Sequence, residues 1–145
     1  MRIIPAHRCV LVGVDGSPNS IAALHRAADE AKRRNARLEV IRVPGDRGHR
    51  LLSPARVAAW LRLRRLVVRE LPRTQQITTR LRIAYGSPAG LLIRAADRAE
   101  LLVVGARGDA SHGNLLGGDT VPRVLASSPC EVVVCAGQAH SELEA

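Results

Sequence analysis

The chain alternates between short continuous apolar runs and longer segments in which apolar residues recur every three or four positions. Continuous runs are typical of parallel strands buried on both faces, and the wider spacing is typical of amphipathic helices. The expected strands are residues 8–14, 37–43, 75–84, 101–104 and 131–135. The expected helices begin near Pro18, Ser53, Pro88 and Asp119 and run to about Asn35, Glu70, Ala99 and Ser127.

This alternation of strands and helices predicts a single α/β domain, with a core over residues 8–136 and a polar tail at 137–145. The strands should form a doubly wound parallel sheet with helices on both faces. Ligands of such sheets bind outside the carboxyl ends of the strands, where the winding direction reverses. Two expected strands end in unusual turns, at 14–17 and 105–108, and both turns would line one crevice if those strands are neighbours.

A glycine-rich stretch follows the apolar run 101–104 and precedes the helix expected at 119–127. A strand, a glycine-rich loop and a helix N-terminus together favour phosphate binding, because bare N–H groups and the helix dipole face the anion. The alternative is that the glycines only mark a long loop. The stretch contains Gly105, Gly108, Gly113, Gly117 and Gly118.

The composition indicates the kind of core, the relation to membranes and the state of the cysteines. Its 145 residues include no Phe, and Trp60 and Tyr85 are the only aromatic residues, so the core must be aliphatic. No apolar run approaches the roughly 18 residues of a membrane span, and the N-terminus lacks a signal-peptide pattern. Cys9, Cys130 and Cys135 lie in or beside apolar runs, which predicts buried reduced thiols in a cytoplasmic protein. Their spacing matches no zinc or redox motif.

The net charge is +9, from 22 basic and 13 acidic residues. Such a balance permits attraction to nucleic acid or anionic lipid without specifying either. No aromatic residues accompany the arginines to stack on bases, so an ordinary solvated surface is favoured over a nucleic-acid partner.

The helix expected at 53–70 has several arginines, and it is expected to pack on the sheet while they face water. A membrane-surface or partner-binding helix is the alternative. Its expected apolar side consists of Val57, Trp60, Leu61, Leu63, Val67, Val68 and Leu71.

Three segments together resemble the universal stress protein family. They are VLVGVDGSPNSIAALHRAADEA at 10–31, YGSPAGLLIRAA at 85–96, and LLVVGARG with LLGGDTVPRVLASSPCEVVVC between 101 and 135. Members of that family that bind ATP carry Gly-x2-Gly-x9-Gly followed by Ser or Thr, and Gly105, Gly108 and Gly118 fit the glycine spacing. The likeness covers nearly the whole chain except residues 44–74.

The resemblance implies a five-stranded sheet of the adenine-nucleotide alpha-hydrolase-like type, with strand order 3-2-1-4-5. It also implies a cytoplasmic stress-response module that regulates an unidentified protein partner and is not an efficient enzyme. The implied ligand is ATP, with ADP or AMP as alternatives and Mg²⁺ as an optional companion. The implied assembly is a homodimer paired through the last strand, Glu131–Cys135.

The resemblance also assigns roles around the crevice between the first and fourth strands. Asp15 would hydrogen-bond the adenine or ribose side of the nucleotide, and Val14 and Val43 would form the apolar wall of the base pocket. The remaining contacts would be made by the glycine-rich stretch. Ribose and the first phosphates would lie beside Gly105, Arg107 and Gly108, and the terminal phosphates beside Gly118, Asp119 and Thr120.

Asp119 departs from the family pattern, because an ionised carboxylate cannot donate a hydrogen bond to phosphate. At 4 Å it would repel a phosphate charge by about 1 kcal/mol in water-like surroundings and about 4 kcal/mol at an effective dielectric of 20. Arg107 and Arg123 could offset part of this, a bridging Mg²⁺ could reverse its sign, and Thr120 could donate instead. Asp119 could equally be the N-cap of the following helix. A nucleotide-free dimeric interaction protein is therefore the second interpretation, and a nucleic-acid-associated protein the third.

Asp109, Ser111 and His112 bring an acid, a hydroxyl and an imidazole into one loop. A catalytic triad depends on geometry and not on proximity in sequence, so these residues do not predict hydrolysis. No catalytic residue and no resident metal site is expected.

Overall fold

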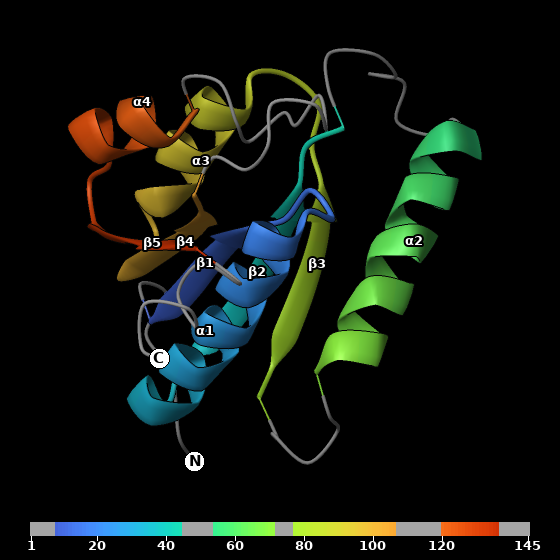
Figure 1. Ribbon diagram of the computed structural model, residues 1–145, viewed down its shortest axis with the longest axis horizontal. Helices are drawn as coiled ribbons and strands as arrows, with labels where there is room; N and C mark the ends of the chain where they lie inside the picture. Colours follow the sequence, from blue (N-terminus) through green and yellow to red (C-terminus); the bar gives the residue numbers. More distant parts are fainter. Residues whose placement is uncertain (1–7, 45–53, 72–76, 107–119, 137–145) are drawn as a thin grey trace.

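The computed structural model describes residues 8–44, 54–71, 77–106 and 120–136 (Figure 1). A five-stranded sheet forms the centre, with the order β3-β2-β1-β4-β5, which confirms the predicted order. Every neighbouring pair of strands is parallel. The strands are β1 (Cys9–Gly13), β2 (Arg37–Arg42), β3 (Thr79–Ile83), β4 (Leu101–Gly105) and β5 (Glu131–Cys135).

Helices cover both faces of the sheet, as predicted for a doubly wound domain. The first two helices bury one face, where Leu24 and Leu63 share a core with Val10 and Val12 of β1. The other two bury the second face, where Leu92 and Val124 share a core with Leu11 of β1. The helices are α1 (Pro18–Arg34), α2 (Pro54–Glu70), α3 (Pro88–Ala96) and α4 (Thr120–Ser127).

Helix α1 begins and ends where its sequence predicts. The hydroxyl of Ser17 accepts a hydrogen bond from the backbone N–H of Ser20 at 3.3 Å, and Pro18 occupies the first helical turn. Asn35 ends the helix in the left-handed conformation with φ 53°. These local signals fix both ends, so α1 lies in a defined register over the sheet.

Two predicted boundaries were too wide. The edge strand predicted at 75–84 is the shorter β3, and residues 75 and 76 lie outside the described part of the chain. The helix predicted to reach Ala99 ends at Ala96, because the N–H of Ala99 turns back to the carbonyl of Ala96 at 3.0 Å. All three cysteines are free thiols, and Cys9 is buried as predicted. Cys130 and Cys135, which flank or end the last strand, differ from prediction because they are only partly buried.

Helix α2 has two apolar sides and not the single side that was predicted. Leu63 and Val67, four residues apart, pack on the sheet. Val57, Leu61 and Val68 are exposed, with 56% of Val57 and of Val68 accessible. The three exposed residues also recur at helical spacing, on a side of α2 about one third of a turn away from the buried side. Packing on the sheet can therefore bury only one of the two apolar sides. Within the described residues, no helix is long and apolar enough to cross a membrane.

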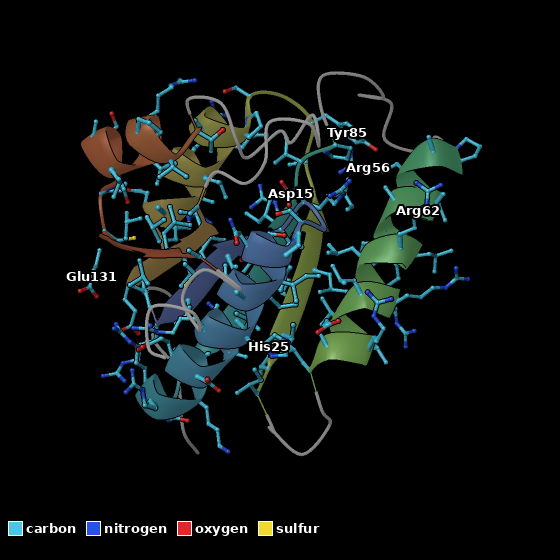
Figure 2. All side chains as sticks on the ribbon, in the orientation of Figure 1. Asp15, His25, Arg56, Arg62, Tyr85 and Glu131 are labelled. Atoms are coloured by element: carbon cyan, nitrogen blue, oxygen red, sulfur yellow. The ribbon has the colours of Figure 1, made fainter. Side chains whose placement is uncertain are left out.

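Polar contacts fix α2 over the carboxyl ends of the strands. The Arg56 guanidinium donates to the carbonyl of Ile83 at 3.1 Å and lies 5.5 Å from the centre of the Tyr85 ring, and Figure 2 shows the two side chains together. At the other end of the helix, Glu70 Oε1 lies 3.0 Å from His25 Nε2 of α1. These contacts position one face of α2 beside the turn that follows β1.

Glu30 is a nearly buried carboxylate at the end of α1. It accepts hydrogen bonds from Arg34 and Arg26 at 3.1 Å each, and also from Arg33. Burial would raise the pKa of Glu30, but the hydrogen bonds from the three arginines and the charge of Arg33 outweigh it and hold that pKa below its usual range. Arg34 extends the network to Glu100 and Glu131, at the starts of β4 and β5.

We expect Glu30→Gln to lower the free energy of unfolding by about 1–3 kcal/mol at neutral pH, because charge-assisted hydrogen bonds to a buried group are lost. The lowered pKa stabilises the fold above about pH 5, and this contribution disappears as the pH falls through the folded-state value. Wild type and variant should therefore converge in acid, which urea unfolding at pH 7 and pH 3 measures. Glu131→Gln is the control, since that side chain is 64% exposed and should change stability by less than about 0.5 kcal/mol. An unchanged difference at pH 3 would contradict the expectation.

Candidate functional site

The turn after β1 is held by its own side chains. One carboxylate oxygen of Asp15, Oδ1, accepts a hydrogen bond from the N–H of Ser17 at 2.8 Å. The hydroxyl of Ser20 accepts from the N–H of Asp15 at 3.3 Å and donates to the carbonyl of Ser17 at 2.9 Å. Gly16 between them has φ 88°, which suits glycine. The position of Asp15 is therefore set by the first turn of α1.

The end of β4 lies directly against this turn. In the register of β1 with β4, Val12 lies opposite Val103. The same register continued by two residues places Val14 opposite Gly105. A Cβ atom on Gly105 would lie 2.6 Å from the carbonyl carbon of Asn19, so α1 crosses the strand at a distance that only glycine allows. The Asn19 side-chain amide also donates to the carbonyl of Ala106 at 3.0 Å. Strands β1 and β4 are thus neighbours at the switch point, whereas residues 107 and 108 of the second predicted turn lie outside the described residues.

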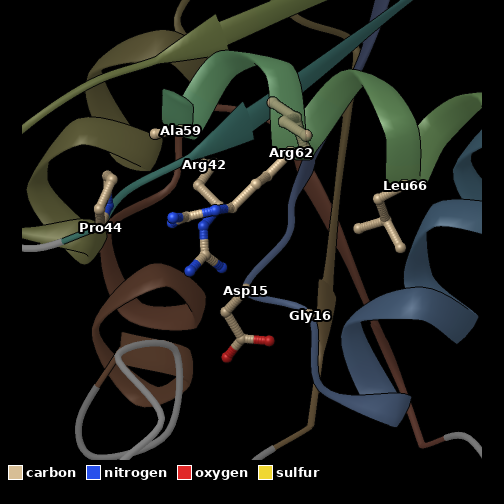
Figure 3. Close-up of a pocket in the computed structure, with 8 residues that line it drawn as sticks. Asp15, Gly16, Arg42, Pro44, Ala59, Arg62 and Leu66 are labelled. Atoms are coloured by element: carbon tan, nitrogen blue, oxygen red, sulfur yellow. The ribbon is translucent and has the colours of Figure 1, made fainter. Parts of the chain in front are cut away.

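A cavity of about 190 Å³ opens beside Asp15. Strand ends and the turn supply one side of it, and α2 supplies the other (Figure 3). This volume is below the roughly 300–1,000 Å³ of a pocket that holds a whole ligand, so the cavity suits one part of a nucleotide. Its lining consists of Asp15, Gly16, Arg42, Pro44, Ala59, Arg62, Leu63 and Leu66.

The charges of this cavity are only partly satisfied within the protein. Oδ2 of Asp15 is buried and has no hydrogen-bond partner among the described residues. A buried unpaired carboxylate oxygen is costly, which makes it a site for a donor from a ligand. Figure 3 shows the side chains of Arg42 and Arg62 meeting at the cavity near the Asp15 turn. Neither arginine forms an ion pair with any carboxylate among the residues that the structure describes.

The predicted site residues divide into a described and an undescribed group. Asp15 follows β1 and Gly105 ends the neighbouring strand β4, and Thr120 begins α4 with 3% of its surface exposed. Val14 and Val43 follow β1 and β2, but Val14 belongs to the core under α1 and α2, and Val43 to the core under α3. The predictions for the glycine-rich loop lie outside the described residues; they concern Arg107, Gly108, Gly118, Asp119, and the trio Asp109, Ser111 and His112.

Sequence reasoning missed the contribution of α2 to the site. Ala59, Leu63 and Leu66 form an apolar wall, and Arg62 lies beside it. Their spacing of four and three residues marks one helix face, so the pattern was visible, but it could not indicate that this face looks toward Asp15. In the described parts of the chain, no group of three or more His, Cys, Asp or Glu side chains could hold a metal ion.

The model of the universal stress protein family matches residues 7–136. A universal stress protein of Mycolicibacterium smegmatis is 31% identical over 140 residues, which cover 86% of this chain and 44% of the relative. The chain therefore spans about half the length of that relative and of the similar universal stress proteins of Mycobacterium bovis and Mycobacterium tuberculosis. A Thermus aquaticus protein described as "Universal stress protein in QAH/OAS sulfhydrylase 3'region" is 28% identical, with 88% of this chain and 97% of the relative covered.

One similar solved structure contains a bound nucleotide. It is a crystal structure of a universal stress protein in complex with cAMP, which is 30% identical to this chain. The two superimpose with a TM-score of 0.63, over 90% of this chain and 97% of that one. The likeness therefore extends over nearly the whole domain.

Proposed function

Since this chain belongs to the universal stress protein family, we propose that it is a regulatory module that binds an adenine nucleotide between β1 and β4. The observation that carries the proposal is the buried Oδ2 of Asp15, which lacks a donor at the point where the sheet reverses its winding. An exocyclic amine or a ribose hydroxyl can supply that donor. The cAMP complex of a relative that is 30% identical supports the same ligand class.

The surroundings of Asp15 support each part of such a ligand. The apolar wall of Ala59, Leu63 and Leu66 can cover one face of the base. Ribose and the first phosphate would lie past the end of β4, where Gly105 packs against the backbone of Asn19 and Ser20 at the start of α1. Arg42 and Arg62 can stack on the base or offset phosphate charge. No step of catalysis is proposed, so occupancy itself would be the signal.

Isothermal titration with ATP, ADP, AMP and cAMP, with and without Mg²⁺, tests the proposal. Saturable binding at one site per chain is expected. Tighter binding of AMP than of ATP without Mg²⁺ would indicate that Asp119 repels the terminal phosphates, and Asp119→Ser should then restore ATP affinity. Recovery of ATP affinity on adding Mg²⁺ would instead indicate a metal bridge. Absence of binding at millimolar concentrations of all these nucleotides would reject the proposal.

A nucleotide-free dimer of the same family is the second candidate, and it is motivated by Asp119, whose carboxylate would repel the terminal phosphates of a nucleotide. β5 is an edge strand, and its Val134 is 39% exposed. An exposed apolar edge is open to pairing with a second strand, so we propose that two copies associate through Glu131–Cys135. Dimerisation is compatible with both candidates. Mass spectrometry of small molecules released from the purified protein separates them, because a retained nucleotide excludes the nucleotide-free candidate.

A further inference from the structure

The second face of the sheet is only partly covered by helices. α3 packs against β1 and β4, and α4 packs against α3 and β5. Figure 1 shows both helices gathered toward the β4–β5 side, with β3 at the opposite edge. In β3, Leu81 packs against the core beneath α1 and α2, whereas Arg80 and Arg82 on the other face are exposed. Parallel strands are normally covered on both faces, so it is unusual that no helix in the described part of the chain packs over this polar face.

A hollow of about 610 Å³ occupies the uncovered region. We refer to it as the arginine groove. Its floor includes the buried side chains of Cys9 and Leu11. One wall comes from β2 and β3, and the other from a stripe at the C-terminal end of α3 with the spacing of one helix face. The remaining lining residues are Arg37, Glu39, Arg80, Arg82, Leu91, Arg94, Ala95 and Arg98.

The arginine groove has a large excess of positive charge. Five arginines line it with one carboxylate, Glu39, which pairs with Arg82 at 3.3 Å. Arg80, Arg94 and Arg98 form no ion pair with the carboxylates of the described residues. Cys9 adds no negative charge at neutral pH, because burial and the charge of Glu39 raise the pKa of its thiol to about 11 against the opposing charges of Arg37 and Arg80.

A concave surface with a buried apolar floor strengthens this field, since low-dielectric walls focus it toward the hollow. Arginines from β3 and from α3 stand on opposite sides, so a narrow anion between them would be neutralised from both. The guanidinium fork suits phosphate oxygens. The lining has no aromatic ring on which a base could stack, which disfavours single-stranded nucleic acid. An extended acidic peptide would turn alternate carboxylates away from the groove, whereas a phosphate chain carries charge on every unit.

We propose that the arginine groove is a binding site for a short linear polyphosphate chain. The groove is separate from the crevice at Asp15. Cys9 and Arg37 begin their strands, and the α3 stripe lies at the end of that helix, so the groove faces the amino-terminal part of the sheet. The Asp15 cavity lies at the carboxyl ends and on the face covered by α2. Binding in the groove therefore does not depend on the proposed nucleotide function.

Titration calorimetry of the full chain with inorganic tripolyphosphate tests the proposal. Saturating AMP is present throughout, and a second series without AMP covers the case in which the chain binds no nucleotide. The double variant Arg80→Gln/Arg94→Gln removes one exposed, unpaired arginine from each wall. The control, Arg64→Gln/Arg65→Gln, removes the same charge from exposed arginines of α2 outside the groove. Circular dichroism checks that both variants fold.

We expect the groove variant to bind tripolyphosphate at least about tenfold more weakly, since each charge-assisted contact is worth that order of affinity. The control should stay within about threefold of wild type, and affinity should fall as salt rises. No binding at millimolar tripolyphosphate, or equal weakening in both variants, would overturn the proposal. It would also be overturned if a poly-glutamate peptide or a single-stranded oligonucleotide bound more tightly than tripolyphosphate with the same dependence on Arg80 and Arg94.

Discussion

Gly105→Ala is expected to destabilise the protein by about 3 kcal/mol or more, which is a large part of the roughly 5–15 kcal/mol that holds a domain of this size together. The added Cβ would lie 2.6 Å from the carbonyl carbon of Asn19 and 2.7 Å from the backbone nitrogen of Ser20. Backbone atoms cannot turn aside as a flexible side chain can. Either α1 or β4 must shift, and α1 is held by Ala23 and Leu24, which are fully buried.

Urea unfolding of Gly105→Ala measures this effect, and Gly90→Ala is the matched control. A Cβ on Gly90 would lie 3.6 Å from the nearest heavy atom, the Ser87 hydroxyl, which is an ordinary contact. Because Gly90 is inside α3, alanine should stabilise the helix by about 0.5–1 kcal/mol. The two alanine substitutions should therefore have opposite signs. A Gly105→Ala protein within about 0.5 kcal/mol of wild type would mean that α1 does not cross β4 as closely as described.

Asp15→Asn is expected to weaken adenine-nucleotide binding about 10- to 100-fold while leaving the fold intact. The amide oxygen can still accept the hydrogen bond from the N–H of Ser17 that Oδ1 accepts now. The amide NH₂, however, replaces the buried acceptor Oδ2 with a donor, so a ligand amine or hydroxyl loses a charge-assisted bond worth about 1.5–3 kcal/mol. The proposed role of Asp15 depends on this change of hydrogen-bonding character.

Calorimetric titration of AMP into Asp15→Asn and into a control, Asp29→Asn, separates this effect from a general change of charge. Asp29 is an exposed carboxylate on α1 away from the cavity lining, and its amide should bind AMP within about twofold of wild type. Thermal unfolding of the unliganded proteins checks their stability. Equal AMP affinity in wild type and Asp15→Asn would remove Asp15 from the binding site. Loss of affinity accompanied by a large fall in melting temperature would assign Asp15 a structural role instead.

Much of the fold follows from local patterns. Ser17, Pro18 and Asn35 mark both ends of α1, and the capping bond and the left-handed φ are present where expected. The run Leu101–Val104 predicted a strand buried on both faces, and all four side chains are fully buried. The family resemblance added the strand order, which is confirmed. The order was not available from periodicity, since hydrophobic spacing does not say which strands pair.

The site was predictable in part. The glycine at the end of β4 and the acidic turn after β1 were identified from sequence, and Gly105 lies against Asn19 and Ser20 of the helix that follows this turn. Neither the α2 wall nor the arginine groove was predicted. Leu63 was predicted only as part of the apolar side that packs on the sheet, and Ala59 and Leu66 were not singled out. The arginines of β2, β3 and α3 are separated by up to 61 positions, from Arg37 to Arg98, so nothing local indicated that they line one hollow.

The sequence by itself determined which segments are helices and strands and where most of them begin and end. Backbone sterics, capping and side-chain periodicity act within a few residues, so these features can be recognised along the chain. Only the tertiary structure decided that Gly105 passes Asn19, that Asp15 and one face of α2 line the same cavity, and that α3 and α4 pack on β1, β4 and β5. Those relations arise when distant segments pack against one another, and their distances depend on the register and offset of whole helices on the sheet.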